Sequence, residues 1–104
     1  MGMNLNKMMK QVQKLQQDMA RAEEELASRT FEATAGGGVV EVTVNGRHEV
    51  TKVTIKPEVV DPEDVEMLQD LILAAVNEAL RKADETVKSE MAKLTGGLKM
   101  PGML

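Results

Sequence analysis

The cations nearest the N-terminus are the residues of this sequence best suited to chemistry with a polyanion. Lys7, Lys14 and Arg21 recur at intervals of seven, with Lys10 and Gln17 between them. On a helix this spacing forms one stripe, because seven residues make nearly two turns. Such a stripe is suited to contact phosphate groups, which attract cations whatever the base sequence. The alternative interpretation is a helix face that is simply solvated.

A second set of cations lies late in the chain, and it consists of Arg81, Lys82, Lys88 and Lys93. Acidic residues three or four positions away can form ion pairs with them on a helix surface. Cations are also favourable near a helix C-terminus without any ligand. We therefore expect a charged helix surface here, although these residues could act together with the first stripe if both helices faced one polyanion.

Signals for catalysis or metal binding are weak. His48 is the single histidine and cysteine is absent, so a metal site would lack its usual ligands. The glycines at 36–38 lack the Gly-Lys-Ser/Thr ending of a phosphate-binding loop and precede a strand. No acid–base pair in a pocket is evident. We expect no enzyme activity, metal, cofactor or small-molecule substrate.

Composition indicates one small domain with a thin core. The chain has 104 residues, with one Phe and no Trp or Tyr. Small domains bury a modest fraction of their surface, so we expect a second copy to help supply the core. The net charge of −4 argues mildly against nucleic acid, but no acid precedes Asp18. No apolar run approaches the ~20 residues of a membrane span and no signal peptide is evident, which favours a cytoplasmic protein with no membrane partner.

Residues 5–28 predict a long helix. Apolar residues recur every three or four positions and form a heptad seam: Leu5, Met8, Val12, Leu15, Met19, Ala22 and Leu26. Asn4 or Asn6 can cap its start. The helix is longer than a thin domain needs, which suggests packing against the second helix or against a partner chain.

Residues 30–34, 39–44 and 47–55 predict three strands. Asn45-Gly46 indicates a two-residue type I′ turn that pairs Val44 with Arg47. Alternation then places Val40, Val42 and Val44 on one face together with Val53 and Ile55. This apolar face needs a cover, and the two helices are the only candidates.

A second helix is predicted from Asp61, as N-cap, with Pro62 at the first helical position. Its apolar stripe continues to about Leu94, and Gly96-Gly97 ends it. We assign residues 1–95 to a single domain and predict that residues 96–104 form a disordered tail.

Several of these segments together resemble the YbaB/EbfC family of bacterial nucleoid-associated proteins. They are the Met-, Lys- and Gln-rich segment 6–14, the run Gly-Gly-Gly-Val-Val-Glu-Val-Thr-Val-Asn-Gly at 36–46, the segment 53–57, the segment 66–79 and the end 96–102. The resemblance covers nearly the whole chain. It implies a tweezer-like homodimer, with helical arms projecting from a joined β body, that binds DNA in the nucleoid.

The sequence thus predicts an α+β fold of order α-β-β-β-α, a three-stranded antiparallel meander flanked by two long helices. The expected function is binding of duplex DNA by a homodimer, mostly through backbone phosphates, with effects on nucleoid organisation and gene expression. The candidate contact residues are Lys7, Lys10, Lys14, Arg21, Arg81, Lys82 and Lys88. A prefoldin-like protein-interaction module is the alternative, and DNA binding that weakens steeply with salt would distinguish the two.

Overall fold

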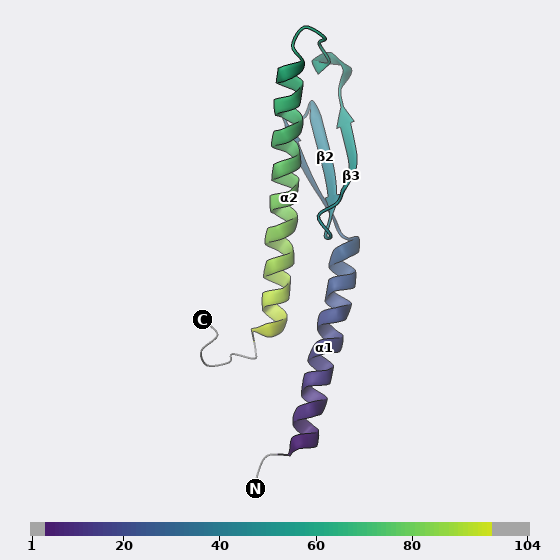
Figure 1. The fold of residues 1–104 in the computed structure, drawn as a ribbon, viewed down its shortest axis with the longest axis vertical. Helices are drawn as coiled ribbons and strands as arrows, with labels where there is room; N and C mark the ends of the chain where they lie inside the picture. Colours follow the sequence, from purple (N-terminus) through teal and green to yellow (C-terminus); the bar gives the residue numbers. More distant parts are fainter. Residues whose placement is uncertain (1–3, 97–104) are drawn as a thin grey trace.

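The elements follow the predicted order α-β-β-β-α, as the computed structural model of residues 4–96 shows (Figure 1). They are α1 (Leu5–Ser28), β1 (Thr30–Ala35), β2 (Val40–Asn45), β3 (Val50–Ile55), the 3₁₀ turn η1 (Pro57–Val59) and α2 (Val65–Thr95). The predicted α+β class is confirmed. Apart from Gly96, the predicted tail lies outside the described residues.

The three strands form an antiparallel meander in the order β1-β2-β3. Val42 of β2 pairs with Ala33 of β1 and with Val53 of β3, so these three side chains share a face. The same register places Val40 beside Ile55. The predicted apolar face is therefore confirmed across the sheet, and the β2 valines at positions 40, 42 and 44 are fully buried within it.

The turn between β2 and β3 differs from the prediction. Asn45 and Glu49 close a three-residue loop, because the Asn45 N–H donates to the Glu49 carbonyl at 3.0 Å. The Asn45 carboxamide oxygen also accepts from the N–H groups of Arg47 and Glu49. His48 adopts the left-handed conformation at φ 64°, as the last residue of such loops requires. Val44 consequently pairs with Val50 rather than with Arg47.

Gly46 is needed in this turn for space, and positive φ occurs instead at His48 and in the glycine run 36–38. A Cβ on Gly46 would lie 1.9 Å from the Leu26 carbonyl oxygen at the end of α1. The hairpin turn thus touches the helix backbone directly. A side chain at this position would force the turn and α1 apart.

A single helix covers the apolar face, where two candidates were expected. α2 packs on β1 and β2, with Ala75, Ala79 and Ala83 fully buried against them. These small residues recur every four positions and let the helix lie close to the strands. β3 extends past the helix, so Val53 remains 45% exposed on the apolar face.

α2 begins three residues later than predicted. The Asp61 carboxylate accepts from the Glu63 N–H at 2.9 Å, and its carbonyl accepts from the Asp64 N–H, so Asp61 organises a turn before the helix. Asp64 is the N-cap and accepts from the Met67 N–H at 3.2 Å. The hydrogen bonds of Asp61 thus stabilise a turn at the place where Asp61-Pro62 predicted the helix start.

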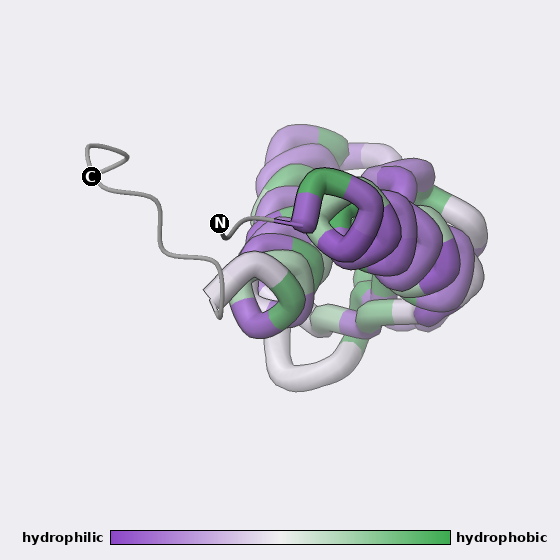
Figure 2. Tube along the Cα trace, turned by 90° about the horizontal axis from the view of Figure 1, so that it is seen from below, coloured by the Kyte–Doolittle hydropathy of each residue, from purple (hydrophilic) through white to green (hydrophobic). Residues whose placement is uncertain are grey.

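α1 departs from the sheet as a projecting arm (Figure 1). Asn4 caps it by accepting from the Lys7 N–H at 3.3 Å, as one of the two predicted caps. Its C-terminal half lies beside the end of α2, and its N-terminal half continues beyond that end. Viewed from below, hydrophilic residues dominate the turns of the arm (Figure 2).

Candidate nucleic-acid interface

The first basic stripe lies along the outside of α1. Lys7, Lys10, Lys14 and Arg21 are all exposed. Since α1 is a continuous helix, the first and last of them are separated by ~21 Å along its axis. The structure therefore brings the four predicted N-terminal candidates together on one accessible face of the arm.

Charge divides this arm into two parts. Residues 4–17 hold Lys7, Lys10 and Lys14 and no carboxylate, a net +3. Residues 18–28 hold Arg21 with four acids, a net −3. Within residues 4–96 no carboxylate forms an ion pair with the three lysines. We call residues 4–17 the arm tip, and its lysines are free to meet an anion.

Arg81 on α2, unlike the lysines of the arm tip, already has carboxylate partners. Its guanidinium bonds Glu78 on one side, at 3.0 Å from Nε to Oε2, and Glu85 on the other. The hydrogen bond to Glu78 raises the pKa of Arg81, and the same contact lowers the pKa of Glu78 despite partial desolvation. Two carboxylates already neutralise this cation.

The other α2 candidates also have partners within the chain. Lys88 pairs with Asp84 at 3.0 Å, and this hydrogen bond is the main cause of the lowered pKa of Asp84. His48 approaches the same carboxylate at 3.6 Å. The Lys82 ammonium donates to the Glu32 carbonyl at 2.9 Å and so ties α2 to β1. The pair of Lys88 with Asp84 is local to the helix, as expected from their spacing. The contacts of Lys82 and His48 join separate elements, so no sequence pattern indicated them.

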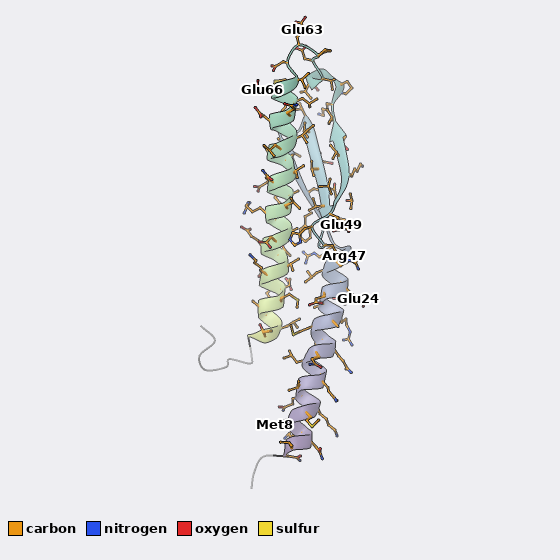
Figure 3. All side chains as sticks on the ribbon, viewed as in Figure 1. Met8, Glu24, Arg47, Glu49, Glu63 and Glu66 are labelled. Atoms are coloured by element: carbon orange, nitrogen blue, oxygen red, sulfur yellow. The ribbon has the colours of Figure 1, made fainter. Side chains whose placement is uncertain are left out.

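Acidic residues gather at the far end of the molecule. Figure 3 shows Glu63 and Glu66 at the start of α2, opposite the end of α1 that carries Met8. Arg47 and Glu49 lie between these ends, where the hairpin turn meets the top of α1 near Glu24. The long axis of the molecule therefore runs from an acidic loop to a basic arm tip.

Residues 4–96 contain no group of three His, Cys, Asp or Glu residues placed to hold a metal ion. In the same range, no helix combines the length and apolar character that a membrane crossing requires.

Known proteins are similar to this chain over nearly its whole length. Residues 1–98 match the family described as the YbaB/EbfC DNA-binding family. A "Nucleoid-associated protein" of Pelotomaculum thermopropionicum is 65% identical over 103 residues, covering 99% of this chain and 98% of that protein. One of Acetivibrio thermocellus is 63% identical, covering 98% and 91%.

A solved structure shares the fold. The crystal structure of uncharacterized protein HP0035 from Helicobacter pylori superposes with a TM-score of 0.77. It covers 91% of this chain and 100% of its own, at 22% identity. At that identity the likeness concerns the fold alone.

Proposed function

This chain belongs to the YbaB/EbfC DNA-binding family, and on that premise we propose that it binds duplex DNA as a homodimer through the arm tips. Lys7, Lys10 and Lys14 are the principal contacts. One observation carries the assignment: these cations are exposed and without carboxylate partners within residues 4–96, while the α2 cations already have partners.

Backbone phosphates are the expected targets. The tip offers lysines and glutamines but neither arginine nor an aromatic residue. Arginine makes the commonest specific contact with guanine, so its absence argues against base-specific contacts by the tip. Lysines on a helix supply mobile positive charge, which suits sequence-independent binding.

The homodimer is proposed to form through the uncovered face of β3. Val53 is paired with Val42 on the apolar face, and the bulge between β2 and β3 brings Val50 beside Val44 there. Both are about half exposed, at 45% and 46%. Burying them against a second copy extends the thin core of each chain, and a two-fold dimer presents two basic arms.

The nucleoid is the proposed place of action, within the cytoplasm. Curated relatives carry the name nucleoid-associated protein, and the family is one of DNA-binding proteins. Binding along DNA without base contacts would influence nucleoid organisation and, through it, gene expression. We propose no catalytic activity.

Charge reversal at the tip tests this function. Lys7→Glu with Lys10→Glu should weaken duplex binding at least tenfold, because four cations per dimer become anions. The matched control is Lys52→Glu with Lys56→Glu, which makes the same charge change on and just after β3. Equal loss in both variants, measured by fluorescence anisotropy at ~50 mM salt, would remove the arm tip from the interface.

A further inference from the structure

The apolar seam of α1 is only half covered. Leu26 is buried, and Leu15, Met19 and Ala22 are partly buried along the stretch beside α2. Beyond the end of α2, the same seam continues through Leu5, Met8, Met9 and Val12, which we call the tip seam. Leu5 is 69% exposed and Val12 54% exposed.

The tip seam is a continuous apolar surface. Its four residues line one shallow groove together with Gln13. The seam continues a helix–helix contact already made within the chain, between α1 and α2. A/d spacing of this kind is the pattern by which one helix packs along another. The geometry therefore fits a helix as the occupant better than a globular surface.

Charges around the tip seam favour a second copy of the same helix. Gln11 borders it on one side and Asn6 and Gln13 on the other, at helical positions set by their spacing. The three lysines fall on a different face, at heptad positions c and f. Two identical tips can thus meet along their seams without placing like charges opposite one another, which would destabilise the pair.

We propose that the tip seam pairs with the tip seam of another dimer, so that two DNA-bound dimers join two duplexes. This rests on the proposed function, because the lysine face is taken to hold DNA. The partner belongs to another dimer, since arms that straddle a duplex keep the tips of one dimer apart. Seam and lysines lie on different faces of α1, so both can be occupied at once.

A single pair of tip seams should bind weakly, and many pairs between the same two duplexes should bind strongly. Each tip contributes four apolar side chains over about two turns of helix. Several dimers bound along each of two duplexes hold many tips at high effective concentration. Bridging should therefore rise steeply with the number of dimers bound on each duplex.

A two-duplex assay measures this directly. One duplex is fixed to beads and a second, labelled duplex is retained only if protein links the two. The seam variant is Met8→Gln with Val12→Gln, which removes apolar surface and keeps good helix formers. The matched control is Met8→Leu with Val12→Ile, which keeps the seam apolar. Binding of each variant to a single free duplex is measured in parallel.

The expected result separates the joining of two duplexes from the binding of one. The seam variant should lose at least 80% of second-duplex retention and keep single-duplex affinity within twofold, while the control retains both. Equal retention by the seam variant, or no retention by the natural chain, would overturn the pairing. The former result would assign the tip seam to another occupant, such as residues 97–104 of the chain itself. Failure of single-duplex binding by the natural chain would instead contradict the proposed function.

Discussion

The environment of each cation decides what it is free to bind. Arg81 is held between Glu78 and Glu85, and an approaching phosphate would have to displace a carboxylate to reach it. Lys10 has no such competitor within residues 4–96. Two residues of the same charge, both candidate DNA contacts by sequence, therefore differ in what they can contribute.

Single neutralisations of these two residues should differ accordingly. Lys10→Gln removes two phosphate contacts per dimer and should reduce the salt slope of binding by about 2. Arg81→Gln should leave that slope unchanged, because its charge is already compensated. Titrations of both variants at ~50 to 200 mM salt make the comparison. A larger effect for Arg81→Gln would shift the interface to α2.

The ion pairs of α2 should give the fold a modest acid dependence. Contact with Arg81 lowers the pKa of Glu78 below its usual 4.5, and contact with Lys88 lowers the pKa of Asp84 below 3.8. A lowered folded-state pKa stabilises the fold fully above the usual value, and this stabilisation is lost as pH falls through the lowered one. The pairs are exposed, so the effect is small.

Thermal unfolding of the natural chain and of the double variant Glu78→Gln, Asp84→Asn tests this acid dependence. The natural chain should have the higher Tm at pH 7, and the two should converge as the pH drops below ~4. A Tm difference that persists unchanged to pH 2 would mean that these carboxylates do not stabilise the fold through their charge.

Secondary structure followed from local sequence wherever one pattern was unopposed. The heptad spacing predicted α1 with both ends correct, and valine alternation predicted the buried face of β2. The predictions of the hairpin loop and of the start of α2 were wrong, because two local preferences compete at each place. Asn45-Gly46 fits two hairpin loops, and its side-chain bonds select the longer one. Asp61 caps its own turn, which leaves Asp64 to begin α2.

The role of Gly46 could not be predicted, because it depends on a contact between separate elements. Gly46→Ala should cost about 2 kcal/mol or more of unfolding free energy, since the Leu26 carbonyl occupies the space of the new methyl group. Gly37→Ala is the comparison, because it has open space and only the strain of φ 75°. It should cost about 1 kcal/mol. Urea unfolding of both variants provides the measurement, and equal costs would contradict the close approach.

At the scale of the whole molecule, charge and apolar surface are sorted along the long axis. The acidic loop, the exposed face of β3 and the basic arm tip follow one another from one end to the other. The sequence predicted which cations share a face of α1. It also predicted the ion pairs within α2, which form between residues three or four positions apart. It did not predict the contact of Lys82, because its partner Glu32 lies 50 residues away.

The β3 face should prove to be the dimer contact. Val53→Lys places a charge on the apolar face and should convert the dimer to a folded monomer. Thr54→Lys, its neighbour, points to the polar face opposite Glu41 and should leave the dimer intact. Sedimentation velocity and circular dichroism report mass and folding together. A dimer that survives Val53→Lys would place the contact elsewhere.

The salt dependence of duplex binding tests the central claim most directly. Three lysines on each of two arms correspond to about six phosphate contacts, so log affinity should fall against log salt with a slope of about −5. Neutralising all three (Lys7→Gln, Lys10→Gln, Lys14→Gln) should bring the slope close to zero in a dimer that is still folded. A slope near zero for the natural chain, or the same steep slope in the variant, would contradict the account.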